Sequence, residues 1–390
     1  MGFALALEEV EILGLDIDKD AVFTYNLNLT KYGCKARRQD ILAWRPAGEF
    51  DIVIGGPPCQ PFSHANVTNI GETHPLYPTF PQFFDVILAL KPKAFLMENV
   101  RGLLRKRFEQ ILQKQLGRVA GEYNVWYAVL NAADYGVPQR RERLFVVGIR
   151  RDVGAGFRFP EPTHGEKPLV RLDGVVVHRW VTLREAIGDL APLPPEEMAQ
   201  LVVPPEAAER IRREREDEGK YWTKMEFPDD PGKPARTIAA NTVEGVKKST
   251  IIVPALPVAK GDEVYQGSFS PIYLSRNRRA DWDEPGYAVL ATARHEPLHP
   301  SSAGIVYRRL SVRECLRVQS FPDWWMFPAS VSTTKKYRLV GEAVSPILAY
   351  RLAVALGRAL GLPTREPPKE EEWQLPYFQR AFADYLGGSP

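Results

Sequence analysis

Short apolar runs alternate with longer segments of helical spacing along the first 160 residues of the chain. Residues 81–91 and the stretch around 108–116 repeat apolar side chains at three- and four-residue intervals, which predicts two helices. The apolar runs with the length and composition of strands are residues 11–18, 51–56, 94–100, 125–130 and 143–149. This alternation predicts an α/β domain around a mostly parallel sheet, with function at the carboxyl ends of the strands.

The pattern changes from about residue 160 to 300, where proline-rich, irregular segments contain only short strand-like pieces. Helical spacing returns where Ser311 and Glu314 form a capping-box pattern, and the last strong helix repeats leucine at every fourth position before Gly361. We therefore predict a larger domain formed by residues 1–160 with 305–362, and a smaller β-rich domain formed by residues 161–304. Residues 363–390 form a charged tail that we expect to be mobile at its start.

Composition excludes several classes of protein. The 390 residues carry 51 basic and 48 acidic side chains, a net charge of +3, so a site for a polyanion must be a local patch. The three cysteines have no metal-ligand spacing and are too few for a disulfide scaffold, so we expect no metal and a reducing compartment. No apolar run reaches the ~18 residues of a membrane helix, and the acidic start is unlike a signal peptide. We predict a cytoplasmic protein without a membrane partner.

Cys59 follows a buried-type strand directly, after a glycine pair and a proline pair. Pro58 and Pro61, on either side of Cys59 and Gln60, restrict the backbone and hold the thiol in one direction. A lone cysteine is most often a small buried apolar residue, but that role does not require three prolines within two residues of it. The pattern therefore predicts that Cys59 is a nucleophile at the end of a sheet strand.

The loop at residues 58–63 resembles the Pro-Cys-Gln-Pro-Phe-Ser nucleophile loop of the DNA (cytosine-5) methyltransferase family. Two further family elements follow in order, Glu-Asn-Val at residues 98–100 and Gln-x-Arg-x-Arg at Gln139, Arg141 and Arg143. Their order and spacing carry the resemblance, because each element alone is a weak signal.

The resemblance extends over most of residues 1–160 and 300–360. It includes an arginine-rich helix that ends in Gln-x-Phe-Pro and the turn at residues 341–346 before the final helix. It implies an S-adenosylmethionine-dependent methyltransferase sheet of Rossmann-like type in the larger domain. The smaller, irregular domain is then a target-recognition domain, since base edges are read by such loops.

The family's chemistry assigns roles to the motif residues. Cytosine C5 is a poor nucleophile, so a thiolate, here Cys59, first adds to C6, and a carboxylic acid, here Glu98, relieves the charge at N3. The resemblance implies that one of two arginines, Arg143 more than Arg141, holds the cytosine O2, and that Asn99 orients the nucleophile loop. Arg141 and Arg143 share one face at strand spacing. The alternatives are a surface salt bridge for Glu98 and phosphate contact or structural pairing for the arginines.

The methyl donor implied by the resemblance is S-adenosylmethionine. Asp16 stands at a strand end where such folds bind ribose hydroxyls, with Asp18 as the alternative and a helix cap as the purely structural explanation. Asp40 and Ile41 match the family's Asp-Ile pair, in which the aspartate accepts from the adenine amino group. The predicted cofactor-binding residues are Gly2, Phe3, Asp16, Ile17, Asp40, Ile41, Pro57 and Val344.

The chain departs from the family at its start. Family members begin with a strand and a Phe-x-Gly-x-Gly-Gly loop around the methionine part of the cofactor, whereas the resemblance here begins inside the following helix, at Met1-Gly2-Phe3. A misplaced start or a truncation would each explain this, and we expect the chain to bind S-adenosylmethionine weakly or not at all. Glu342 stands where the family usually has asparagine, and the loop after Ser63 lacks the usual pattern.

The positive charge is regional, because residues 241–340 carry 14 basic and 9 acidic side chains. The resemblance implies double-stranded DNA as the partner of a monomer, with the target base flipped out because C6 is inaccessible within the stack. The predicted DNA-binding residues are Gln60, Ser63, Lys247, Lys248, Arg276, Arg278, Arg279, Lys335 and Lys336.

Together these features predict a prokaryotic modification enzyme that methylates C5 of cytosine in a specific duplex sequence, with a cognate restriction endonuclease acting on the same site. Two alternatives stay open. One is a catalytically impaired DNA-binding relic or partner subunit. The other is a transfer-RNA cytosine-5 methyltransferase, which would lack a recognition domain as large as residues 161–304.

Overall fold

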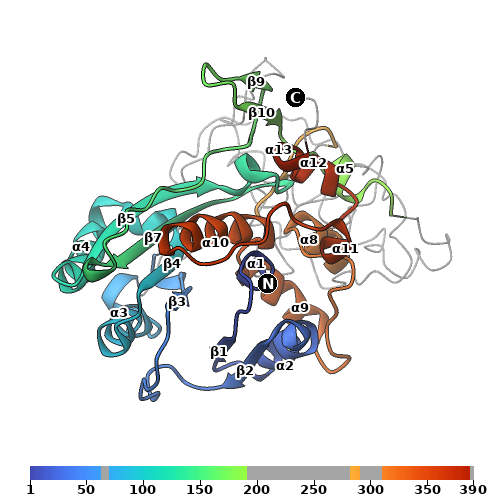
Figure 1. The fold of residues 1–390 in the computed structure, drawn as a ribbon. Coiled ribbons are helices and arrows are strands. Elements are labelled where there is room, and N and C mark those ends of the chain that lie inside the picture. The colour runs from blue at the N-terminus through green and yellow to red at the C-terminus, as the bar shows by residue number, and fades with distance from the viewer. Residues whose placement is uncertain (63–69, 191–281, 290–309, 387–390) are drawn as a thin grey trace, which may run out of the picture.

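The computed structural model describes residues 1–62, 70–190, 282–289 and 310–386 (Figure 1). The strands are β1 (Ile12–Asp16), β2 (Cys34–Arg38), β3 (Ile52–Gly55), β4 (Ala94–Val100), β5 (Tyr123–Asn131), β6 (Gln139–Arg140), β7 (Glu142–Arg150), β8 (His164–Gly165), β9 (Leu169–Val170), β10 (Val176–Arg179) and β11 (Gly286–Tyr287). The helices are α1 (Gly2–Ala6), α2 (Lys19–Leu29), α3 (Thr79–Leu90), α4 (Lys106–Val119), α5 (Leu183–Ile187), α8 (Val312–Val318), α9 (Thr333–Glu342), α10 (Pro346–Leu360), α11 (Glu370–Trp373), α12 (Phe378–Ala381) and α13 (Ala383–Leu386).

The main sheet has the strand order β3-β4-β7-β5, with β3 parallel to β4 and β7 antiparallel to both of its neighbours. Side chains alternate between its two faces, as a pleated strand requires. Leu96 and Val147 pack in the core that contains α1 and α10, whereas Phe95 and Val146 pack in the core that contains α3 and α4. The sheet is therefore buried on both faces, which explains why β4 and β7 read as nearly continuous apolar runs.

A second sheet contains only β1 and β2, which are parallel. Among the described residues, β1 pairs only with β2 and β3 pairs only with β4, so each has one unpaired edge. Residues of both strands line one cavity of about 3900 Å³. Leu13 on β1 and Ile54 on β3 are large apolar side chains that stay 42% and 46% exposed. We call the part of this cavity between the unpaired edges of β1 and β3 the inter-sheet gap.

Helices from opposite ends of the sequence pack closely beneath the sheet. A Cβ at Gly2 would lie 2.5 Å from the backbone nitrogen of Tyr350 and 2.6 Å from Ala349, so α1 can approach α10 only with glycine there. The predicted last helix is present as α10, and Gly361 ends it in the left-handed region with φ 66°. The capping box predicted at Ser311 and Glu314 starts α8.

All five strands predicted from the sequence are present, as β1, β3, β4, β5 and β7, and both predicted early helices are present as α3 and α4. The strand β2 was not predicted, because its residues Cys34–Arg38 are mainly charged and form no apolar run. It pairs with β1 and keeps only Cys34 fully buried.

The C-terminal residues differ from the expected mobile tail. Trp373, Phe378 and Phe382 are buried in the same core as α10. Arg351 on α10 donates two hydrogen bonds of 2.8 Å to the carboxylate of Asp384, which fixes α13. The tail is thus part of the core of the larger domain up to Phe382.

The predicted boundary at residue 161 is also not a boundary in packing. Leu183 and Ile187 of α5, with Val181 before it, belong to the core that contains α10. The recognition segments 191–281 and 290–309, including the charged stretch at residues 211–220, lie outside the described residues.

One described helical stretch, Thr333–Leu360, is long and apolar enough by length and composition to cross a membrane, and 67% of its most apolar window is buried within the protein. It consists of α9 and α10, which a short turn separates. Leu348, Leu352 and Leu356 of α10 are each at most 2% exposed and pack against the sheet, so this stretch behaves as a core helix.

Candidate active site

Cys59 lies in the short loop that follows β3, at the carboxyl end of the strand. Three residues later Phe62 is fully buried and makes edge-to-face contacts with Phe80 and Phe108, at ring-centroid distances of 5.0 and 5.5 Å. This aromatic anchor fixes the loop on the α3 and α4 side of the sheet. Burial raises the pKa of the Cys59 thiol, which nearby Arg143 partly offsets, so the resting group is a thiol at neutral pH.

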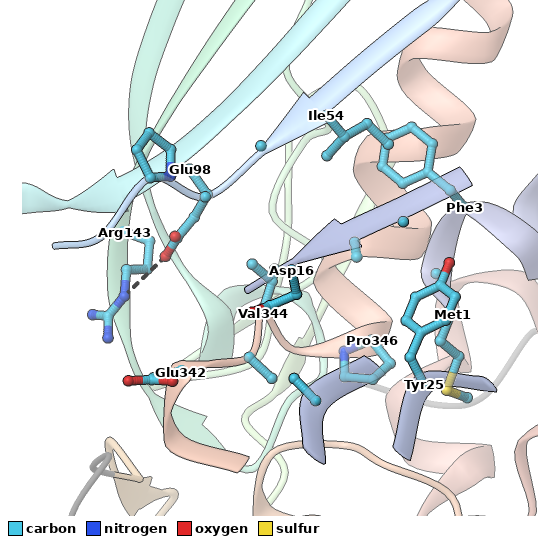
Figure 2. A pocket seen from close by; sticks show the side chains of 18 of the residues that line it. Met1, Phe3, Asp16, Tyr25, Ile54, Glu98, Arg143, Glu342, Val344 and Pro346 are labelled. Carbon is cyan, nitrogen blue, oxygen red and sulfur yellow. Dashed lines mark ion pairs between the residues drawn. The ribbon is translucent and has the colours of Figure 1, made fainter. Parts of the chain in front are cut away.

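Glu98 and Arg143 form an ion pair at the edge of the same cavity, with 3.0 Å between Arg143 Nε and Glu98 Oε1 (Figure 2). Their Cα atoms are diagonal neighbours on β4 and β7, because Glu98 pairs with Phe145 and Val100 with Arg143. Burial raises the pKa of Glu98, opposed by the charge of Arg143. Glu98 therefore holds a proton more readily than an exposed glutamate does, as a general acid must.

Asn99 is fully buried and connects β4 to the nucleophile loop. Its Nδ2 donates to the Pro57 carbonyl at 3.1 Å, and its Oδ1 accepts from Val100 N at 2.8 Å. The Pro57 carbonyl is two residues from Cys59, so the amide fixes the approach of the loop. This is the placement that the expected orienting role requires.

Arg141 lies between β6 and β7, and it lines the same cavity as Arg143. Its side chain is buried and donates to the carbonyls of Val289 at 2.9 Å, Gly341 at 2.7 Å and Ala343 at 3.3 Å. The charges of both arginines lower the pKa of Glu98, and Arg143 also forms the 3.0 Å ion pair with it. Arg141 takes the structural role, joining three chain segments around the site.

We expect Arg141→Gln to lower the free energy of unfolding by about 3 kcal/mol, because buried carbonyls would lose their charged donor. Thermal unfolding of this variant and of Arg143→Gln measures the difference. Arg143→Gln should unfold within a few degrees of the parent protein. Equal loss of stability in both variants would contradict the separation of roles.

The sequence motifs include Gln139 and, in Gln-x-Phe-Pro, Gln319, but they indicate no role for either glutamine. In the structure, Gln139 Nε2 donates to Gln319 Oε1, and Gln319 Nε2 donates to the carbonyls of Val340 and Ala343 at 2.9 Å each. Ser345 Oγ also donates to Gln319 Oε1, at 3.2 Å. This buried network holds the turn between α9 and α10, and only the motif resemblance could have indicated it.

The predicted cofactor residues meet around the inter-sheet gap. Asp16 ends β1, and burial raises the pKa of its carboxyl. Asp40 follows β2, and its Oδ1 accepts from Leu42 N at 2.9 Å. Phe3 of α1 points toward Ile54 of β3 (Figure 2). All the predicted cofactor residues line the one cavity, namely Gly2, Phe3, Asp16, Ile17, Asp40, Ile41, Pro57 and Val344.

The predicted DNA-contacting residues have different placements. Gln60 lines the cavity. Lys335 pairs with Asp18, and Lys336 is only 9% exposed. A DNA contact by either lysine stays a prediction. The remaining predicted contacts lie outside the described residues, namely Ser63, Lys247, Lys248, Arg276, Arg278 and Arg279.

The model of the C-5 cytosine-specific DNA methylase family matches residues 1–358. Among curated proteins, the type II methyltransferase M.MthTI of Methanothermobacter thermautotrophicus is 33% identical over 348 residues, covering 84% of this chain and 86% of the relative. M.FnuDI of Fusobacterium nucleatum is 30% identical over 379 residues, which cover 92% of this chain and 91% of the relative.

Solved structures share the fold. A DNA modification methyltransferase encoded within an E. coli prophage covers 92% of this chain and 94% of its own, at a TM-score of 0.57 and 20% identity. The S. pombe Dnmt2 methyltransferase has a TM-score of 0.54 and 16% identity, and the match covers 89% of this chain and 90% of that protein's chain. The predicted α/β methyltransferase fold is thus confirmed.

The architecture and the matches define a DNA-methylating enzyme class. This chain belongs to the C-5 cytosine-specific DNA methylase family. The predicted activity, DNA (cytosine-5-)-methyltransferase, is confirmed, and the family's methyl donor is S-adenosylmethionine.

Proposed function

We propose that the chain transfers a methyl group from S-adenosylmethionine to C5 of a flipped-out cytosine in a specific duplex sequence, as a type II modification enzyme. One observation carries the proposal. Cys59, Glu98 and Arg143 come from three different segments, and all three line the cavity that the predicted cofactor residues also line. A nucleophile, an acid and a cation around one opening are the groups that addition to a pyrimidine ring needs.

The residues divide the reaction between them. Cys59 Sγ, after losing its proton, forms a bond to cytosine C6. Glu98 gives a proton to N3, and this proton neutralises the negative charge that the addition pushes into the ring. The C5 atom of the resulting ring is then nucleophilic. Arg143, already paired with Glu98, faces the same opening and holds the cytosine O2. Once C5 carries the methyl group, the C5 proton is lost to solvent water and its bonding electrons re-form the C5–C6 double bond. Cys59 Sγ then leaves C6 as a thiolate, and N3 returns its proton to Glu98.

The residues present fit the ribose and adenine of the cofactor. Asp16 and Asp40 offer carboxylate acceptors at two neighbouring strand ends, and Phe3, Ile17 and Ile41 offer apolar walls. When bound, the cofactor supplies the electrophilic methyl group. The fit is less complete on the side of the inter-sheet gap, where the strand edges of β1 and β3 are unpaired in the described part of the chain.

Several further assignments complete the proposal. The partner is double-stranded DNA, bound by a monomer in the cytoplasm, with a restriction endonuclease acting on the same site. The curated relatives reported above are named type II methyltransferases, which favours DNA over transfer RNA as substrate. The DNA-binding relic stays the second candidate, because the incomplete gap between β1 and β3 would weaken the cofactor site.

The deciding experiment is transfer of a tritiated methyl group from labelled S-adenosylmethionine into duplex DNA, followed by mass analysis of the nucleosides. The proposal expects 5-methylcytosine in duplex DNA and none in transfer RNA. Label in transfer RNA alone would replace the proposal with its transfer-RNA alternative. Duplex binding without any label would favour the relic.

We expect Glu98→Gln to slow methylation by at least ~10²-fold, the usual range for loss of a general acid, with duplex affinity unchanged. The amide keeps the shape and a contact to Arg143 but cannot give up a proton to N3. Single-turnover methylation measures the effect. Glu122→Gln is the matched control, because Glu122 forms an exposed ion pair with Lys91 far from the site. Parental turnover in Glu98→Gln would make Glu98 structural.

A further inference from the structure

Helix α9 is attached to the predicted cofactor turn through one half-buried ion pair. Lys335 Nζ pairs with Asp18 Oδ2, and both side chains are 19% exposed. Asp18 Oδ1 accepts at the same time from Asp20 N at 2.9 Å and Ala21 N at 3.3 Å, which caps α2. One carboxylate therefore joins α9 to the turn between β1 and α2, although 317 residues separate Lys335 from Asp18.

The other end of α9 is attached to the reaction side of the cavity. The carbonyls of Gly341 and Ala343, at the end of the helix, accept from Arg141 Nη2 at 2.7 and 3.3 Å. Arg141 precedes Arg143 by two residues. The helix thus spans from the Asp16 turn to the strand that presents Arg143, with Arg338 and Glu342 lining the cavity between them.

Asp16 is surrounded by charges from two elements. Burial raises the pKa of its carboxyl, and neighbouring Asp18 also raises it, whereas Lys335 and Arg338 on α9 lower it. Asp18 N donates to Asp16 Oδ1 at 2.8 Å. On β2, the facing Arg38 directs its Nε to the Ile17 carbonyl at 3.0 Å instead. The hydrogen bond from Asp18 N is the largest influence that lowers the pKa of Asp16 against its burial, and the cations Lys335 and Arg338 of α9 add to it.

We propose that Lys335 is a positioning residue for the cofactor, which anchors α9 on the β1–α2 turn and, together with Arg338, keeps Asp16 charged as the acceptor for the ribose hydroxyls. The inference rests on the proposed function, since Asp16 meets a ribose only when S-adenosylmethionine binds. A charged carboxylate accepts two hydroxyl hydrogen bonds, whereas its protonated form accepts poorly and must donate.

The test is calorimetric titration with S-adenosylmethionine between pH 5 and 8. Lys335→Met keeps the length of the side chain and removes its charge and its anchor on Asp18, so we expect about tenfold weaker binding at the acidic end of this range. Asp16 should then be protonated at a higher pH, so affinity should be lost earlier as the pH falls. Lys335→Arg should restore both. Lys93→Met is the control, because Lys93 forms an exposed pair with Asp51 at 2.7 Å.

Three results separate the inference from the proposed function. In the first, the parent protein binds the cofactor, and Lys335→Met binds it with the same affinity and loses that affinity at the same low pH. This result would overturn the inference but not the proposed function. A loss of duplex affinity with a shallower salt dependence, and no cofactor effect, would make Lys335 a phosphate contact and overturn it too. A parent protein that neither binds the cofactor nor methylates DNA would overturn both.

Hydrogen exchange gives a readout when the heat of binding is too small to fit. Loss of the Lys335 anchor should raise deuterium uptake in α9 and in the Asp18 turn together, while Lys93→Met changes neither. Uptake that rises in neither segment, or in α9 alone, would contradict the anchoring role.

Discussion

Replacing Cys59 by serine should abolish methyl transfer while duplex binding survives. A serine alkoxide is far harder to form than a thiolate at neutral pH. Burial already raises the pKa of the Cys59 thiol, and Arg143 is the nearby cation that opposes this. The measurement is tritium transfer into duplex DNA beside a gel-shift titration.

A covalent complex with DNA containing 5-fluorocytosine gives an independent check. The parent protein should form it, and Cys59→Ser should not, because fluorine blocks release of C5 after the thiolate has added to C6. Cys315→Ser is the matched control, since Cys315 is buried in α8 away from the cavity. An active serine variant, or a parent protein that forms no adduct, would disprove the nucleophile assignment.

Adding one strand and a glycine-rich loop ahead of Met1, ~15–20 residues at ordinary element lengths, should raise the affinity for S-adenosylmethionine by at least ~10²-fold. The edges of β1 and β3 both belong to parallel pairs, so a strand between them can bond on both sides. Burying Leu13 and Ile54 would add to its stability. The backbone of the loop would then contact the methionine part of the cofactor.

Calorimetry of the extended and the present chain measures this effect, and mass analysis of the DNA follows activity. An extension of equal length made of glycine and serine is the control, because it cannot form a stable strand. Tight binding by the present chain would show that another segment completes the pocket. Weak binding by both would favour the DNA-binding relic.

The sequence was sufficient for the elements whose apolar pattern matches their burial. β4 and β7 are buried on both faces, so their apolar runs were visible without any structure. β2 was missed because its stability comes from pairing with β1 rather than from apolar side chains. The tail was misjudged, because three glutamates and two prolines hide Trp373 and Phe378, which pack in the core.

The candidate site was predictable where a sequence motif lies at or just after the end of a predicted strand. Cys59 and Glu98 needed only the order β3, loop, β4 to be placed together. The carbonyl partners of Arg141 were not predictable, because they lie up to 202 residues away in the sequence. The interruption between β6 and β7 at Arg141 was not visible in the sequence either. Pairings such as Lys335 with Asp18 likewise depend on the tertiary fold alone.

The packing of α1 against α10 has a consequence for synthesis on the ribosome. The first helix to leave the ribosome finds its partner, around Ala349 and Tyr350, only when most of the chain has been made. The Arg351–Asp384 contact delays closure of that core further, until α13 has emerged. Such sequence-distant contacts slow folding and leave apolar surface uncovered meanwhile. Nascent chains should therefore occupy chaperones at least until α13 has emerged.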